Sequence, residues 1–242
     1  MTILVLGATG ATGTHLTRYL LDRGHVVKTV ARSAKKISSD LADHPNLNVI
    51  EASVLDLSDS ELEVIVADCT AVASCLGHTM SFSGVYGHPR RLVTDAAKRI
   101  CAAVSSNRPS VPIKYVLMNT TGNSNRDVDE PISFAQRCVI GALRLMLPPH
   151  VDNEEAADFF RTEIGPESRD IAWTVVRPDT LVDHDEASAY ELHPSPTRSA
   201  IFDAGKTSRI NVGHFMGQLI EGEELWFKWK GKMPVIYNSE SQ

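Results

Sequence analysis

Short runs of aliphatic and β-branched residues alternate along this chain with longer stretches in which apolar positions recur at helical spacing. The short runs predict buried strands, and the longer stretches predict amphipathic helices. Regular alternation of the two predicts βαβ units around a parallel sheet. We therefore expect an α/β fold with strands at 2–6, 25–31, 48–52, 71–75, 114–118, 172–176 and 233–237.

The intervals between these strands contain the expected helices. Gly24 suits a helix end, and Ser58 suits a helix N-cap. In the second half, Pro148-Pro149 is expected to end one helix, and Asp152 or Asn153 to cap the next. The expected helices cover 12–24, 58–66, 91–104, 134–146, 152–164 and 211–220.

Residues 183–206 lack a regular pattern and are rich in proline, serine and charge. Loops of this length are usually functional or disordered. The segment follows the strand at 172–176, whose carboxyl end faces the ligand crevice in such sheets. We expect an inserted loop or small lobe near the substrate site that moves as a flap; the alternative is a surface insertion that never meets substrate. The aromatic run at 226–230 is expected to be a core or interface strand.

Composition supports a single domain over residues 1–242. Hydrophobic residues make up 43% of the 242 residues, which is enough for a sizeable core. The net charge of -6 argues against a nucleic-acid partner, and no apolar run is long enough to span a membrane. The four cysteines lack zinc-type spacing, so we expect buried, reduced thiols and no metal site. These features favour a soluble, cytoplasmic monomer or homodimer.

A glycine-rich turn directly follows the first expected strand and opens the first helix. Gly7 permits a tight turn, Gly10 lets a pyrophosphate approach the backbone, and Gly13 permits close packing of the helix. The N–H groups at the helix start attract an anion. This context predicts a dinucleotide site, with an ordinary glycine-rich turn as the alternative. Its expected residues are Gly7, Thr9, Gly10, Ala11, Thr12 and Gly13.

The residues after the second expected strand bear on the choice of dinucleotide. An acidic side chain at this place would bind the adenosine ribose hydroxyls of NAD. The chain has Arg32 and Ser33 there instead, followed by Lys35 and Lys36. A guanidinium and ammonium groups suit the 2′-phosphate of NADP(H), although a solvated basic loop would have the same composition. We expect NADP(H) as the cofactor, with NAD(H) as the alternative.

The ordered set of motifs resembles the atypical short-chain dehydrogenase/reductase superfamily. Within it, the chain is similar to NAD(P)H-binding proteins of the biliverdin-IXβ reductase/flavin reductase kind and to the NmrA-like proteins. The resemblance spans nearly the whole chain and implies a Rossmann-type doubly wound parallel sheet with a small C-terminal substrate region. It rests on the glycine turn, Arg32-Ser33, Leu76-Gly77, Asn119-Thr120-Thr121, residues 173–178 and residues 208–216.

The resemblance also implies further contacts with the cofactor. From the adenine to the nicotinamide, the implied residues are Ser53, Val54, Leu76, Gly77, Thr120, Thr121 and Pro178. Many relatives carry an aspartate where this chain has Ser53, which weakens the expected adenine contact there.

One motif of the classical short-chain dehydrogenases is absent. Those enzymes pair a tyrosine with a lysine on the helix after the fifth strand, where the tyrosine transfers a proton. Between Pro131 and Ile164 this chain has neither residue type, which disfavours ordinary alcohol and ketone chemistry. Hydride delivery to a flavin, quinone or tetrapyrrole-like acceptor leaves a stabilised anion, so it can proceed by positioning alone.

Thr121 and His78 are the candidate catalytic residues. The resemblance puts Thr121 where the biliverdin-IXβ/flavin reductases have a serine, so its hydroxyl would bind a substrate carbonyl or a water, or would only orient the cofactor. His78 lies in the loop after the fourth strand and is either a proton donor or an exposed loop histidine. Asp179 either takes part in catalysis or turns the chain.

These features favour an NADPH-dependent reductase of a flavin, a quinone or a similar conjugated small-molecule acceptor. The alternatives are a non-catalytic NADP(H)-binding sensor of the NmrA-like type, and a biosynthetic isomerase or reductase with a dedicated substrate. The fold alone does not separate these hypotheses.

Overall fold

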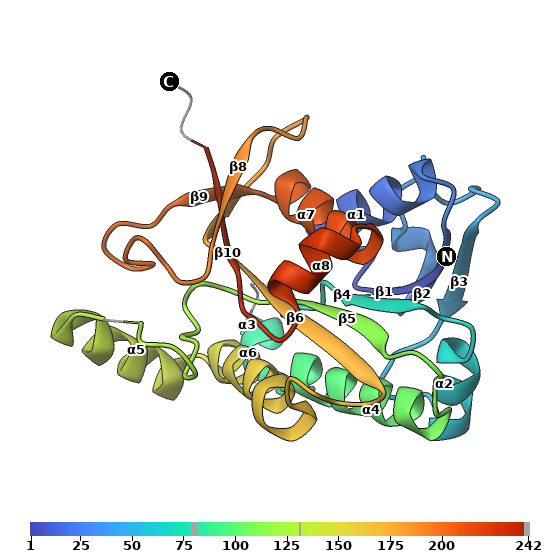
Figure 1. Ribbon diagram of the computed structural model, residues 1–242, viewed down its shortest axis with the longest axis horizontal. Coiled ribbons are helices and arrows are strands. Elements are labelled where there is room, and N and C mark those ends of the chain that lie inside the picture. Colours follow the sequence, from blue (N-terminus) through green and yellow to red (C-terminus); the bar gives the residue numbers. More distant parts are fainter. Residues whose placement is uncertain (79–81, 131, 240–242) are drawn as a thin grey trace.

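The computed structural model describes residues 1–78, 82–130 and 132–239 and is built around one twisted sheet (Figure 1). The sheet has eight strands in the order β3-β2-β1-β4-β5-β6-β10-β8, and β7 pairs with β9 in a separate two-stranded sheet. All neighbours in the large sheet are parallel except β10 and β8. The strands are β1 (Thr2–Leu6), β2 (Val26–Ala31), β3 (Leu47–Glu51), β4 (Ala71–Ser74), β5 (Ile113–Met118), β6 (Ile171–Pro178), β7 (Thr180–Val182), β8 (Tyr190–His193), β9 (Lys206–Ser208) and β10 (Val235–Asn238). The expected doubly wound α/β fold with a small C-terminal region is confirmed.

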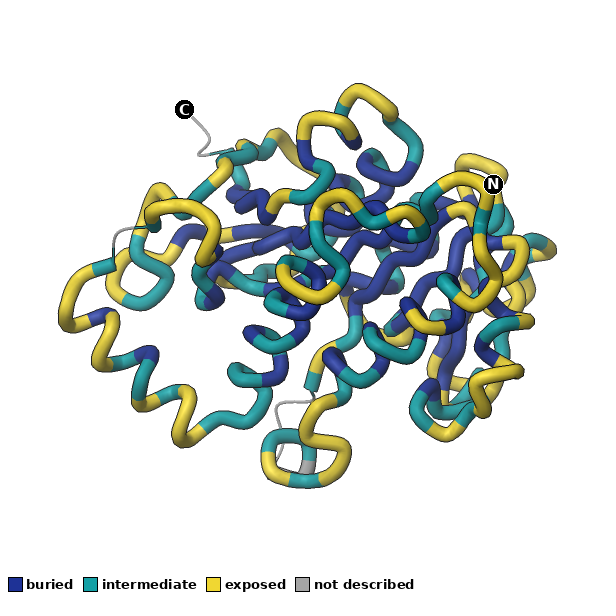
Figure 2. Tube along the Cα trace, turned by 60° about the horizontal axis from the view of Figure 1, so that its bottom comes forward, coloured by how far each residue is buried: buried dark blue, intermediate teal, exposed yellow. Residues whose placement is uncertain are grey.

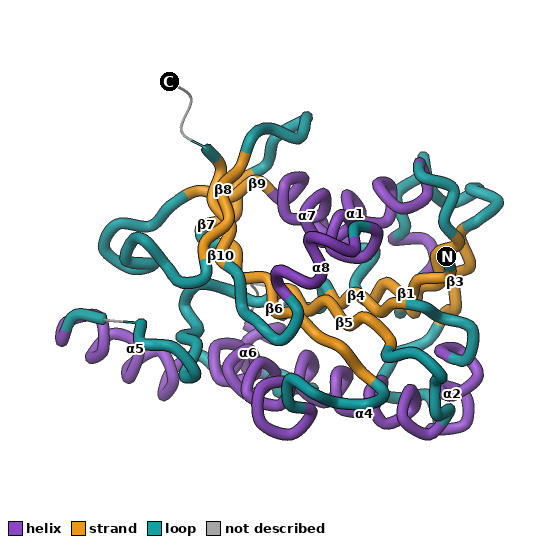
Figure 3. Tube along the Cα trace, viewed as in Figure 1, coloured by secondary structure: helices purple, strands orange, loops and turns teal. Residues whose placement is uncertain are grey.

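Helices cover both faces of the sheet (Figures 1 and 3). One face carries α1, α7 and α8, and the other carries α2, α4 and α6. Helix α5 lies apart from both layers at one end of the molecule. The helices are α1 (Ala11–Asp22), α2 (Asp59–Val66), α3 (Phe82–Tyr86), α4 (Leu92–Ser106), α5 (Phe134–Met146), α6 (Pro148–Asp158), α7 (Arg209–Glu221) and α8 (Glu223–Trp229), with a 3-10 turn at Ala34–Lys36 and a π-helical turn at Phe159–Ile164.

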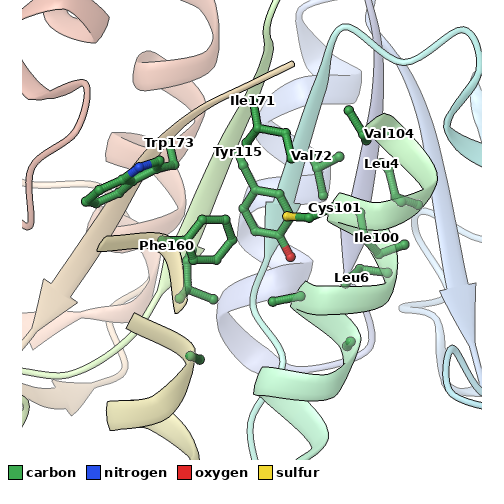
Figure 4. Close-up of a cluster of buried hydrophobic side chains, with 14 of the residues drawn as sticks. Leu4, Leu6, Val72, Ile100, Cys101, Val104, Tyr115, Phe160, Ile171 and Trp173 are labelled. Atoms are coloured by element: carbon green, nitrogen blue, oxygen red, sulfur yellow. The ribbon is translucent and has the colours of Figure 1, made fainter. Parts of the chain in front are cut away.

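The sheet is apolar on both faces because both are covered. In β1, Leu4 and Leu6 join the core under α2 and α4, whereas Ile3 and Val5 join the core under α1 and α7. A continuous apolar run is the pattern expected of a strand buried on both sides. Figure 2 shows the strands as the buried centre of the molecule, and Figure 4 shows one of the two cores.

Several helix ends follow from local sequence. The Ser58 hydroxyl accepts from the Glu61 N–H, and the Glu61 carboxylate accepts from the Ser58 N–H at 2.7 Å, so the expected N-cap of α2 is part of a full capping box. Gly24 follows the end of α1 with a φ of +77°, a conformation that favours glycine.

The expected cap at Asp152 is wrong. Helix α6 begins at Pro148, because proline is well accommodated in the first turn, and Asp152 lies inside the helix. Its buried carboxylate instead accepts from the N–H groups of Val93 and Thr94, each at 2.9 Å. These are first-turn donors of α4, whose own N-cap residue Arg91 supplies no capping side chain. A residue distant in sequence therefore caps α4.

The C-terminal aromatic run is a helix rather than the expected strand. Trp226 and Trp229 are buried, whereas Phe227 between them is 70% exposed. A spacing of three puts both tryptophans on one helix face, against the core under α7. The neighbouring segment 183–206 also differs from a plain loop, since it contains β8, which pairs with β10 at the sheet edge.

Two further expectations concern the state of the cysteines and membrane-spanning segments. All four cysteines are free; Cys69, Cys75 and Cys101 are buried as expected, but Cys138 on α5 is exposed. No helix within the described ranges combines the length and the apolar character needed to cross a membrane.

Candidate cofactor and substrate site

A cavity of about 320 Å³ lies at the carboxyl ends of four adjacent strands, β3, β2, β1 and β4. This is the edge at which parallel α/β sheets bind ligands. The cavity is lined by ten of the expected cofactor residues: Gly7, Thr9, Gly10, Arg32, Ser33, Lys36, Ser53, Val54, Leu76 and Gly77. Residues that are up to 70 positions apart in the chain, from Gly7 to Gly77, therefore form one wall.

The three glycines of the turn have different neighbours. Gly7 has a φ of +79°, and a Cβ there would lie 2.7 Å from the Cys75 carbonyl, so only glycine fits against β4. A Cβ on Gly13 would overlap the Gly7 carbonyl oxygen. A Cβ on Gly10 would meet only that same oxygen at 3.3 Å and would otherwise enter the cavity. The space at Gly10 is thus open to a ligand, whereas Gly7 and Gly13 serve the turn itself.

Helix α1 begins directly at this turn. Gly10 is its N-cap and provides no side-chain hydrogen bond, and the first turn contains no acidic residue. The N–H groups at the helix start therefore lack a capping side chain and favour an anion. Ala11 is exposed, Thr12 and Gly13 are buried, and none of these three expected cofactor residues lines the cavity.

Arg32 and Lys36 supply positive charge at the far end of the cavity. Arg32 follows β2, and both side chains are exposed at the cavity wall. Neither makes a hydrogen bond or ion pair with any residue that the structure describes. Nearby, the Glu51 carboxylate accepts from the Ala34 N–H at 2.9 Å and holds this turn against β3. A phosphorylated dinucleotide would fit these features together: the bare backbone at Gly10, the uncapped N–H groups of α1, and the two unpaired side-chain cations of Arg32 and Lys36.

A second cavity, of about 260 Å³, lies at the carboxyl ends of β5 and β6. Because β5 and β6 follow β4 in the sheet, this cavity continues the same edge beyond Gly77. Its lining residues are Thr120, Thr121, Gly122, Gln136, Ile140, Leu143, His150, Asp179, Thr180, Ala200 and Ile201. One side is polar, and the side formed by α5 and residues 200–201 is mainly apolar.

Thr121 and Asp179 are joined at the wall of the second cavity. The Thr121 N–H donates to the Pro178 carbonyl at 3.0 Å, which ties the loop after β5 to the buried end of β6. The Thr121 hydroxyl is hydrogen bonded to the Asp179 carboxylate, which also accepts from the N–H groups of Thr180 at 2.8 Å and Gly205 at 3.0 Å. Burial raises the pKa of Asp179, although these hydrogen bonds oppose the shift.

His78 lies elsewhere. Its Nε2 is 2.7 Å from the Asp152 carboxylate, and its Nδ1 is 3.2 Å from the Gly84 carbonyl oxygen. The side chain is only 5% exposed. Burial raises the pKa of Asp152, but its hydrogen bonds to His78 and to α4 outweigh this and lower it. His78, in the loop after β4, thus contacts α6 and α3 and lies outside the walls of both cavities.

Arg177 holds the loop beside the second cavity in place. Its side chain is fully buried and forms a two-pronged ion pair with Glu130, at 3.0 and 2.7 Å. The guanidinium also donates to the carbonyl oxygens of Asn123, Met233 and Pro194. A buried guanidinium needs such complete pairing. It links the end of β6 with the loop after β5 and with segment 183–206.

His150 is a site residue that the sequence reasoning missed. It lies in the first turn of α6, beside the prolines that were expected only to end a helix. The one available signal was its spacing of four from Glu154, which places the two side chains on one helix face. Gln136, Ile140 and Leu143 were also missed, because nothing in α5 marks which of its faces meets a cavity.

A family described as NAD(P)H-binding matches residues 7–223 of this chain. The match begins at the glycine turn and includes both cavities. Among curated proteins, an uncharacterized chloroplastic protein of Arabidopsis thaliana is 36% identical over 80 residues, which are 33% of this chain and 29% of that protein.

Three solved structures share the fold at low sequence identity. A short-chain dehydrogenase/reductase from Veillonella parvula, solved in complex with NADP, is 20% identical with a TM-score of 0.69 over 98% of this chain and 94% of that one. ChuY, an anaerobilin reductase from Escherichia coli O157:H7, is 15% identical with a TM-score of 0.68 over 100% and 99% of the two chains. SP1627 from Streptococcus pneumoniae, described as an NADH-flavin reductase, is 14% identical with a TM-score of 0.66 over 99% of this chain and 100% of that one.

Proposed function

Since this chain belongs to the NAD(P)H-binding family of atypical short-chain dehydrogenases/reductases, we propose that it is an NADPH-dependent reductase of a flavin, a quinone or a similar conjugated acceptor. The observation that carries the proposal is the pair of cavities along one sheet edge. The first suits the dinucleotide, with Gly10 at the pyrophosphate and Arg32 and Lys36 at the 2′-phosphate. When bound, the nicotinamide supplies a hydride to an acceptor in the second.

The lining of the second cavity supports a conjugated acceptor. Ile140, Leu143 and Ile201 offer an apolar wall for a flat ring system, and Thr121 offers a hydroxyl to a carbonyl at its edge. The helical region after β5 contains no tyrosine–lysine pair, so ordinary carbonyl reduction lacks its proton donor. Two of the structural neighbours are described as reductases of anaerobilin and of flavin, which agrees with this class of acceptor.

The preference for NADP(H) over NAD(H) is part of this proposal. It is supported by the two uncommitted cations at the cavity wall, and by a neighbour of the same fold that was solved with NADP. A location in the cytoplasm and a monomeric or dimeric state remain predictions from the sequence.

Turnover measured beside binding tests the proposal. The purified protein is titrated with NADPH by calorimetry, and NADPH oxidation is then followed with FMN and with simple quinones. Binding with turnover of at least one acceptor supports a reductase. Binding without turnover of any acceptor would reject it and favour the NADP(H) sensor. The variant Gly10→Val, which fills the cradle, is the control for signals unrelated to this cavity.

A further inference from the structure

His150 is fixed at the wall of the second cavity. Its side chain is 10% exposed, and its Cε1 lies 3.7 Å from the position that a Cβ on Gly122 would occupy. Gly122 directly follows Thr121, so the imidazole lies against the same stretch of backbone as the hydroxyl expected to contact the acceptor.

A carboxylate one helical turn away lies beside this ring. The Nε2 of His150 is 3.4 Å from Oε1 of Glu154. Glu154 is itself held by a two-pronged pair with Arg144 on α5, at 2.8 and 2.9 Å. Burial alone would raise the pKa of Glu154, but its contacts with His150 and Arg144 hold it at about 2. Glu154 is therefore an anion whose position is set by α5 and α6.

The other ring nitrogen is uncommitted. Within the described parts of the chain, Nε2 of His150 is buried beside Glu154 without a hydrogen bond, and Nδ1 has none either. Glu154 of α6 faces the ring, Arg144 of α5 pairs with Glu154, and Asp179 after β6 lines the same cavity. The Nε2 side of the ring faces Glu154, which leaves Nδ1 for a ligand.

We propose that His150, held by Glu154, is the proton donor that completes reduction of the acceptor; this rests on the proposed reductase function. Hydride addition from NADPH places two electrons and one hydrogen on the acceptor and leaves it anionic. The Nδ1–H bond of His150 then breaks, and an N–H or O–H bond forms on the acceptor. The neutral imidazole regains its proton from water, and NADP⁺ and the fully reduced acceptor are released.

Thr121 has a different role in this arrangement. Its hydroxyl is bonded to Asp179 and is a poor acid, so it positions the acceptor rather than supplying the proton.

Chemical rescue of the variant His150→Ala tests the proposal. With NADPH and 2-methyl-1,4-naphthoquinone, we expect kcat to fall roughly 100-fold, the low end of the effect of a positioned general acid. The KM for the quinone and the affinity for NADPH should change little. Added imidazole should restore part of the lost kcat by entering the vacated space. His184→Ala, at an exposed histidine outside both cavities, should behave as wild type.

A second readout does not depend on turnover. In histidine-ring NMR spectra, the His150 signals are assigned by their loss in His150→Gln. They should shift when the quinone is added with NADP⁺, which cannot reduce it, whereas the His184 signals should not. An unchanged kcat in both His150 variants, or a loss that imidazole does not restore together with unmoved ring signals, would overturn the assignment while the reductase function stands. NADPH binding without any turnover in the wild type would overturn both.

Discussion

At the scale of single residues, the same residue type serves different purposes within a few positions. Gly7 and Gly13 are glycines because backbone atoms of the protein occupy the space of a Cβ, and Gly10 is a glycine because a ligand would. Likewise, the cations Arg32 and Lys36 line the cavity, whereas Lys35 between them does not. These differences give matched pairs of substitutions.

The glycine turn gives the first pair. We predict that Gly10→Val folds, with a small loss of stability from its 3.3 Å contact, and shows no measurable NADPH binding in calorimetry. Gly13→Val should instead be destabilised by more than about 4 kcal/mol, because its Cβ overlaps a backbone oxygen that cannot move away. Normal NADPH affinity in folded Gly10→Val would show that the turn is structural only.

The basic turn gives the second pair. Arg32→Ala should weaken NADPH binding by about 1.5–3 kcal/mol, the range of a charge-assisted hydrogen bond, and should affect NADH much less. Lys35→Ala is the control, since it removes a charge from the same turn outside the cavity. Equal losses for both cofactors in Arg32→Ala would contradict the assignment of this residue to the 2′-phosphate.

At the scale of elements, peripheral pieces are attached by a few polar contacts. Helix α5 has only Gln136 and Ile140 buried among its thirteen residues. The Arg144–Glu154 pair fastens it to α6, and the Ser199 hydroxyl donates to Gln136 from the opposite side at 3.0 Å. The apolar wall of the second cavity therefore depends on an ion pair, and not on a deep core.

This dependence predicts a pH-sensitive contribution to stability. The folded state lowers the pKa of Glu154 to about 2, so its contribution is present above the ordinary glutamate pKa and is lost as the pH falls toward 2. Glu154→Gln should reduce the unfolding free energy by about 2–3 kcal/mol at neutral pH, and the difference should shrink from about pH 4.5 downward. Urea unfolding at several pH values measures this. As the control, Glu163→Gln, in an exposed pair with Lys98, should lower the unfolding free energy by well under about 1 kcal/mol at every pH. A loss of stability in Glu154→Gln that does not change with pH would refute the electrostatic account.

At the scale of the whole molecule, the chain brings the ends of distant segments to one sheet edge. Segment 183–206 reaches this edge from the C-terminal region, where Ala200 and Ile201 line the second cavity while β8 is part of the sheet. After β8 it is attached at Pro194, which accepts from Arg177, at Ser199, which donates to Gln136, and at its end by Gly205, which donates to Asp179. The part after β8 is therefore the one able to open without disturbing the sheet.

We predict that residues 194–205 form a flap that closes over bound acceptor and excludes water. Hydrogen exchange is compared for the free protein, the protein with NADPH, and the protein with NADP⁺ and a quinone. Protection should increase at 194–205 only with the quinone, at the glycine turn with either nucleotide, and not at β8, which is already paired. No change at 194–205 while the glycine turn becomes protected would leave a surface insertion that never meets substrate.

A structural feature could be predicted from the sequence when neighbouring residues alone determine it. The seven expected strands all form within two residues of their expected bounds, because most of them are nearly continuous apolar runs, as strands buried on both faces must be. The glycine turn and the residues after β2 were proposed from strand ends that the sequence marks, those after β3 and β4 from the family resemblance, and all of these segments line one cavity. The small strands β7, β8 and β9 were missed, since such short pairings depend on a partner elsewhere in the chain.

The sequence by itself determined the sheet, its two helical layers and the cofactor crevice, because periodicity, turn glycines and strand ends are properties of neighbouring residues. Only the tertiary structure decided which polar groups meet. It capped α4 with Asp152, turned His78 toward that same carboxylate, joined Thr121 to Asp179, and set His150 against Glu154. Most of these contacts join side chains from different elements. Their partners are set by how helices pack on the sheet, a constraint that no local pattern contains.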